Sequence, residues 1–114
     1  MKDSNASNEI SHEAKLVIHV LEKNGMWPIS DITYKRGKSI DDPIVIDFVD
    51  DYVQAEYLVA GFLLHPNKYE FQMQFLLDKD DKHYDHLLYE VTEKDGTVHQ
   101  EKFFFDITIG YNAN

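Results

Sequence analysis

The segment from Tyr69 to Leu77 constrains the fold more than any other part of this sequence. Apolar side chains occupy every second position of its first seven residues, and the positions between them hold glutamate or glutamine. Alternation with a period of two is typical of a β-strand that buries one face. We therefore expect a strand here, with three of its side chains in the hydrophobic core: Phe71, Met73 and Phe75.

The preceding stretch, residues 43–63, has two interpretations. As a hairpin that turns at Asp50-Asp51, it sets Phe48 opposite Val53, and both faces of the two strands then agree in character. As a helix that starts at Asp42-Pro43, it carries one apolar stripe that ends at Phe62. The hairpin is preferred because β-branched residues favour strands, and this stretch contains Ile44, Val45, Ile46, Val49 and Val53.

The N-terminal part of the chain predicts a helix over residues 9–24. Its apolar residues recur at helical spacing, Asn8 or Ser11 is placed to cap its start, and Gly25 is placed to end it. Trp27 follows, and we expect it to close one end of the core. Two residues of this helix are expected to pack on the sheet: Val17 and Leu21.

Further strands are expected on both sides of these segments. Residues 29–38 alternate weakly, residues 86–93 alternate more clearly, and the Asp95-Gly96 pair predicts a hairpin turn. The last strand is expected over residues 98–111. Its core side chains are expected to be Phe103, Phe105 and Ile107.

Together these elements predict an α+β fold, in which an N-terminal helix packs on a mostly antiparallel sheet of about five or six strands. Residues 1–8 are expected to form a flexible tail, and residues 9–111 a single domain. This order of elements resembles the cystatin-like and NTF2-like layouts. The resemblance implies one helix wrapped by a meander of strands.

The composition excludes several classes of protein. The chain has no cysteine, so it has no disulfide framework, thiolate metal site or cysteine nucleophile. Residues 1–8 lack the apolar segment of a secretory signal, and no apolar run is long enough to cross a membrane. We therefore expect a cytoplasmic protein that does not bind membranes.

Charge is the strongest compositional signal, since 21 acidic and 11 basic residues give a net charge of −10. The acids are concentrated in residues 41–56, which contain no lysine or arginine, and in residues 78–95. The short basic cluster at 35–38 lies in a strongly acidic chain, so we expect no contact with nucleic acid. The acidic blocks either keep the protein soluble or attract a basic partner.

No motif for catalysis, a cofactor or a metal ion is complete. Residues 78–81 begin like a calcium loop, but His83 and Tyr89 stand where that loop requires glycine and glutamate. His83 and His86 lack an identifiable third ligand for zinc, and the five glycines are too scattered to form a phosphate loop. We therefore expect no catalytic, cofactor-binding or metal-binding residues.

The sequence favours a protein-binding inhibitor that neutralises a basic target. In size and charge the chain resembles small bacterial immunity proteins, which block nuclease toxins, and phage-encoded inhibitors of nucleases. Acidic side chains can occupy the positions at which a nuclease binds phosphate. The alternative is a small-molecule-binding or enzymatic domain that uses the concave face of the sheet, possibly as a homodimer. The expected partner-binding residues of the inhibitor are Asp47, Asp50, Asp51, Tyr52, Glu56 and Leu58.

Overall fold

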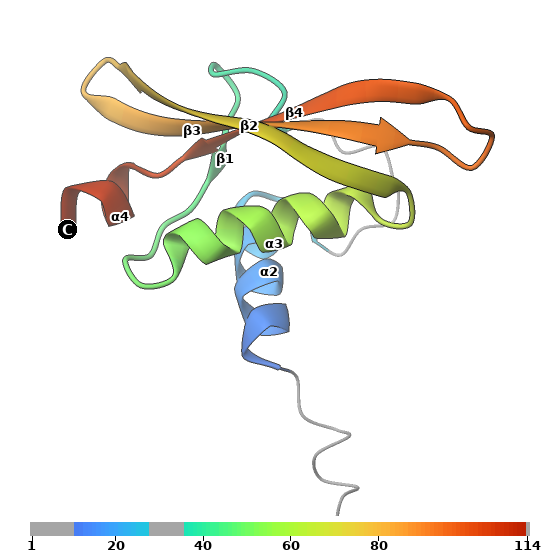
Figure 1. Ribbon diagram of the computed structural model, residues 1–114. Helices are drawn as coiled ribbons and strands as arrows, with labels where there is room; N and C mark the ends of the chain where they lie inside the picture. Colours follow the sequence, from blue (N-terminus) through green and yellow to red (C-terminus); the bar gives the residue numbers. More distant parts are fainter. Residues whose placement is uncertain (1–10, 28–35, 114) are drawn as a thin grey trace, which may run out of the picture.

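The computed structural model describes residues 11–27 and 36–113. These residues contain three helices and four strands, in the order α2 (His12–Lys23), β1 (Ile44–Val45), α3 (Tyr52–Leu64), β2 (Lys68–Lys79), β3 (Lys82–Thr92), β4 (Val98–Asp106) and α4 (Thr108–Ala113). The four strands form one sheet in the order β1-β4-β3-β2. Helices α2 and α3 lie on the same side of this sheet (Figure 1). The α+β class is therefore confirmed.

Helix α2 follows its sequence signals closely. The Ser11 side chain accepts a hydrogen bond from the backbone nitrogen of Ala14, 3.1 Å away, and so caps the first turn. Gly25 has a φ of 71° just after the helix ends, a conformation that costs glycine little. Val17 and Leu21 are buried, as predicted, and they fix the face of α2 that packs on the rest of the domain.

The predicted hairpin over residues 43–63 is wrong. The β-branched residues Ile44 and Val45 do form a strand, but it pairs in parallel with β4 instead of folding back on itself. Helix α3 then begins at Tyr52, after Asp51 adopts a left-handed conformation with a φ of 61°. The helical alternative was correct for this part, although its expected start at Asp42-Pro43 was too early. The buried residues of α3 recur at helical spacing: Ala55, Glu56, Val59, Ala60 and Leu64.

The sheet has four strands among the described residues, where five or six were expected. Much of the difference comes from residues 43–63, which supply one two-residue strand and a helix. The predicted strand at 29–38 lies mostly outside the described residues, as does the predicted tail at 1–8. The cystatin-like or NTF2-like order is not confirmed, because a second long helix, α3, separates the first strand from the others.

The three strands β2, β3 and β4 form the antiparallel meander that the sequence predicted. The last of them ends earlier than expected, at Asp106. The Asp106 carboxylate accepts hydrogen bonds from the backbone nitrogen of Thr108 at 3.0 Å and from its hydroxyl at 2.6 Å. This local turn directs the chain into α4, so residues 108–111 are helical and not extended.

The core lies between the helices and the inner face of β3 and β4. The predicted burial of Phe103, Phe105 and Ile107 is confirmed. The predicted burial of three β2 side chains is wrong, since their exposed fractions are high: 44% for Phe71, 51% for Met73 and 43% for Phe75. There are two physical reasons: β2 lies at the edge of the sheet, with a neighbouring strand on one side only, and a register shift between Phe71 and Met73 places Met73 and Phe75 on the face away from the helices.

None of the helices within residues 11–27 and 36–113 combines the length and the apolar character that crossing a membrane requires.

Candidate functional site

Three of the acids predicted to bind a partner lie in residues 47–51, the loop between β1 and α3, which we call the acidic loop. Two of them contact histidines of α2: Asp47 lies 2.8 Å from Nε2 of His19, and Asp51 lies 3.1 Å from Nε2 of His12. Asp50 is exposed. The acids are therefore gathered as expected, but in a loop fixed to α2 and not at a hairpin tip.

The other three predicted residues lie on α3 and point in different directions. Tyr52 packs against Gly110 of α4, where an added Cβ would collide with the tyrosine ring. Leu58 is half-buried and lines a groove described below. Glu56 is fully buried, whereas its predicted role in binding a partner requires an exposed side chain. Helical spacing, in place of strand spacing, turns Glu56 toward the core.

Glu56 forms a buried carboxyl pair with Asp85 of β3, which is itself only 2% exposed. Neither carboxyl oxygen of Glu56 has a hydrogen-bond partner of normal geometry. Burial, and secondly the adjacent Asp85, raises the pKa of Glu56 from 4.5 to about 10. Glu56 is therefore protonated at neutral pH, because an ionised carboxylate would be too costly in this environment.

Tyrosines surround the buried carboxyl pair. Burial is the main cause that raises the pKa of Tyr52, Tyr57 and Tyr89, and nearby carboxyl groups contribute to it. Tyr89 also packs edge-on against Phe71 and Phe103, with ring centroids 5.6 and 5.9 Å apart. This combination of a protonated acid, a second carboxyl and phenols is chemically suited to proton transfer or to binding a polar group.

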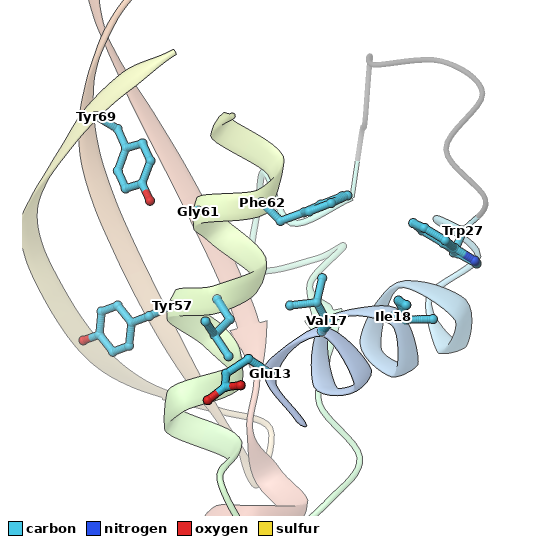
Figure 2. Close-up of a pocket in the computed structure, with 10 residues that line it drawn as sticks. Glu13, Val17, Ile18, Trp27, Tyr57, Gly61, Phe62 and Tyr69 are labelled. Atoms are coloured by element: carbon cyan, nitrogen blue, oxygen red, sulfur yellow. The ribbon is translucent and has the colours of Figure 1, made fainter. Parts of the chain in front are cut away.

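An open apolar groove of about 430 Å³ lies between α2, α3 and the first part of β2 (Figure 2). Tyr57 and Tyr69 lie on the side of α3 that faces the sheet, and Phe62 lies on the side that faces Trp27 (Figure 2). The lining contains one charged side chain, and its members are Glu13, Ala14, Val17, Ile18, Trp27, Tyr57, Leu58, Gly61, Phe62 and Tyr69.

Several features show why this groove stays open. Gly61 has no side chain, and an added Cβ would lie 2.7 Å from the Tyr69 hydroxyl oxygen, so a larger residue would displace that ring. The Trp27 and Phe62 rings contact each other with centroids 6.4 Å apart, yet both remain substantially exposed, at 39% and 44%. The expected role of Trp27 as a plug for the core is therefore not what the structure shows.

The groove and the acidic loop meet at the N-terminal end of α2. Glu13 lines the groove, and the adjacent His12 makes the contact with Asp51 of the acidic loop. An apolar surface thus ends beside several carboxylates. Sequence reasoning found the acids but missed the groove, because its lining comes from three separate elements and the connecting segment after α2. A glycine within the otherwise apolar stretch of α3, at Gly61, was the one local signal.

In the part of the chain that the structure describes, no three histidine or acidic side chains are grouped to hold a metal ion. His83, one of the histidines considered as a ligand, contacts Asp78 at 2.6 Å and stacks on Tyr111 of α4. His86 stacks instead on Phe104, on the other face of β3. The two histidines therefore diverge, as strand geometry requires.

Comparison of the chain with family models, with curated proteins and with solved structures found no match in any of the three.

Proposed function

We propose that this chain is a protein-binding inhibitor that neutralises a basic protein, such as a nuclease, and that it holds an apolar helix of that protein in the groove. The observation that carries the proposal is the position of the apolar groove directly beside the acidic loop. Apolar anchors in a groove supply most of the affinity of such complexes, whereas charges at the rim speed association and select the partner.

The expected partner segment follows from the chemistry of the groove. The side chains that line it come mainly from two helices and include four aromatic rings. A groove of this kind suits an amphipathic helix, whose apolar residues three and four positions apart fill it. Glu13 in the lining, and Asp51 beside His12, then favour lysine or arginine at the corresponding end of the bound helix.

The proposal is tested with a synthetic amphipathic peptide that carries leucines at helical spacing and lysines elsewhere. A second peptide has glutamates in place of the lysines. In nuclear magnetic resonance titrations, the lysine peptide should shift the amide signals of α2 and α3 around the groove, and Phe62→Ala should weaken its binding by about tenfold or more. Equal binding of the two peptides would contradict the proposed charge selection.

The chain offers a closely matched control for the acidic loop. Asp50→Asn with Asp51→Asn removes two charges beside the groove, and Asp80→Asn with Asp81→Asn removes two charges at the turn between β2 and β3. Asn tolerates the left-handed conformation of Asp51, Asp80 and Asp81. The Asp50/Asp51 double substitution should lower the affinity for the lysine peptide by roughly three- to tenfold at low salt and by less at high salt. The Asp80/Asp81 double substitution should leave that affinity unchanged.

Inhibition itself is tested with a panel of purified basic nucleases, by measuring the rate of DNA cleavage with and without the chain. We expect at least one enzyme to be inhibited, with an association rate that falls as salt rises. If peptides bind in the groove but no nuclease is inhibited, the chain is a binding domain with a different class of target.

A second candidate function is supported by the buried pair of Glu56 and Asp85. Buried, unpaired carboxyl groups are costly, and they are concentrated at sites that bind or transform small molecules. In this alternative a small molecule occupies the concave side of the sheet, and protonated Glu56 donates to it. A fragment screen tests the idea: the affinity of a true ligand should fall in Glu56→Leu, whereas a fragment that binds only in the outer groove should not respond.

A further inference from the structure

The outer edge of β2 is long, and no other strand within the described residues pairs with it. This strand has twelve residues, lies at the end of the sheet, and pairs with β3 on one side only among the described residues. Exposed strand edges are usually blocked by proline, by charges or by a covering segment, because they can pair with another chain. In β2 there is no proline, and the lysines stand only at its ends, Lys68 and Lys79.

The charge of β2 also distinguishes it from the rest of the molecule. Its two lysines are balanced by Glu70 and Asp78, so the strand has no net charge, whereas the whole chain carries −10. Two copies of so acidic a chain repel each other over most of their surfaces. Along β2 this repulsion is weaker because the strand itself carries no net charge, which points to a second copy of this chain as the occupant of the edge.

A β-bulge defines which part of the edge is available for pairing. The register between β2 and β3 shifts between Phe71 and Met73, so Gln72 interrupts the regular alternation. Beyond it, Met73–Lys79 pair with β3 without interruption. Leu76 lies opposite the buried Asp85 and therefore faces the helices, whereas Phe75 lies opposite His86 on the other face.

We propose that two copies of the chain pair edge to edge and antiparallel through Met73–Lys79, around a twofold axis at Leu76. Such an interface uses the same residues from both copies. In this register each pair lies on one face of the joined sheet. Apolar residues meet apolar residues and polar residues meet polar ones in three of the four pairs, and in the fourth Met73 meets the aliphatic stem of a lysine. The pairs are Leu76 with Leu76, Phe75 with Leu77, Gln74 with Asp78, and Met73 with Lys79.

The side chains at this edge have apolar surface available for burial. Leu76 and Met73 are each 51% exposed, and Phe75 is 43% exposed. Pairing would cover these residues and satisfy backbone groups along the edge. The opposite edge of the sheet cannot pair in this way because β1 has only two residues. The paired segment Met73–Lys79 contains none of the residues that line the groove, so the dimer and the inhibitor function are tested by different substitutions.

The position of the twofold axis permits a charge-swap experiment on the full chain. Leu76→Lys places two lysines together, and Leu76→Glu places two glutamates together, so each variant alone should be monomeric in sedimentation measurements. An equimolar mixture of the two should recover the dimer, because one lysine then meets one glutamate. Val98→Lys, at an exposed apolar strand position away from the edge, should dimerise like the unaltered chain.

Met73 provides a second test that does not depend on Leu76. Because it lies opposite Lys79 of the second copy, Met73→Lys should weaken dimerisation and Met73→Glu should strengthen it, each by about threefold to tenfold at low salt. Three results would overturn the proposal: a chain that stays monomeric up to about 1 mM, a Leu76→Lys variant that still forms dimers, or folded Leu76 variants that fail to recover a dimer when mixed.

Discussion

Strands β2 and β4 belong to the same sheet, but they differ in how far their apolar side chains are buried. β2 has the cleaner alternation of apolar and polar residues, and yet most of its apolar side chains are exposed. β4 contains three consecutive phenylalanines, a pattern without alternation, and all three are buried. The regularity of a pattern therefore did not decide which strand forms the core.

The difference follows from the place of each strand in the sheet. β4 lies between β1 and β3, and its inner side chains Phe103 and Phe105 pack beneath the helices. Its outward residue Phe104 is buried as well, partly by stacking on His86 at a centroid distance of 4.2 Å. β2 has a neighbouring strand on one side only, and the register shift between Phe71 and Met73 turns Met73 and Phe75 to the face away from the helices. Alternation thus indicates that a strand has an apolar and a polar face. The place of the strand in the sheet then decides how deeply the apolar face is buried.

The largest expected effect comes from truncating one phenylalanine in each strand. Phe103→Ala removes a fully buried ring and should lower the free energy of unfolding by about 3–5 kcal/mol. Phe75→Ala removes a ring that is 43% exposed, and the loss should be about 1 kcal/mol. Urea unfolding of both variants measures the two losses. Equal losses would show that β2 is as well buried as β4, which would contradict the comparison.

Local signals were sufficient for much of the fold. Helix α2 and the three-stranded meander could be predicted because caps, turns and periodicity lie within short stretches of sequence. The stretch 43–63 could not, because its residues satisfy both a strand register and a helical stripe, and only packing against α2 and the sheet distinguishes them. Helix α4 was missed since its start depends on a turn between Asp106 and Thr108.

The candidate site was predictable only in part, for the same reason. The acids of residues 47–51 are consecutive or nearly so, and their clustering needs no tertiary information. The groove and the buried carboxyl pair each combine residues from separate elements, as Glu56 of α3 and Asp85 of β3 show. A sequence lists these residues but does not indicate that they meet.

The second prediction compares how stability depends on pH through a carboxyl group in the core, Glu56, and through an exposed one on β2, Glu70. The pKa of Glu56 is about 10, against 4.5 for the free group, mainly because it is buried. The folded state therefore keeps a proton that the unfolded state releases, so the contribution of Glu56 to stability is complete below pH 4.5 and is lost as pH rises toward 10. At about 1.4 kcal/mol per pH unit, the loss by pH 7 is roughly 3 kcal/mol.

Glu56→Gln should flatten this decline, because the amide stays neutral at every pH and has a similar shape. Unfolding free energies measured from pH 5 to pH 9 should therefore show a gap between the variant and the unaltered chain that widens as pH rises. Glu70→Gln on β2 removes an exposed carboxyl group and serves as the control. If the two variants have parallel pH profiles, Glu56 is not held protonated in the core.

The smallest effect is expected from weakening the attachment of β1. Its pairing with β4 is what makes β4 an interior strand of the sheet. Asn24 is buried at the end of α2, where its amide nitrogen donates to the carbonyls of Val20 and Val45, and its oxygen accepts from the Val45 nitrogen, each at 2.8 Å. Asn24→Ala leaves the carbonyl and the nitrogen of Val45 without this partner, whereas the Val20 carbonyl keeps the backbone nitrogen of residue 24. We expect a loss of about 1–3 kcal/mol in the free energy of unfolding.

The structural effect of Asn24→Ala should be confined to the β1 side of the sheet. If β1 detaches, β4 becomes an edge strand like β2, and hydrogen exchange should accelerate at the Ile46 amide, which donates to Asp106, and along the β4 edge. Amides between β2 and β3 should keep their protection relative to global unfolding. Asn67→Ala, in the turn before β2, controls for the loss of an asparagine side chain. Equal acceleration across all four strands would show that β1 does not protect β4 separately, because the sheet would then open as one cooperative unit.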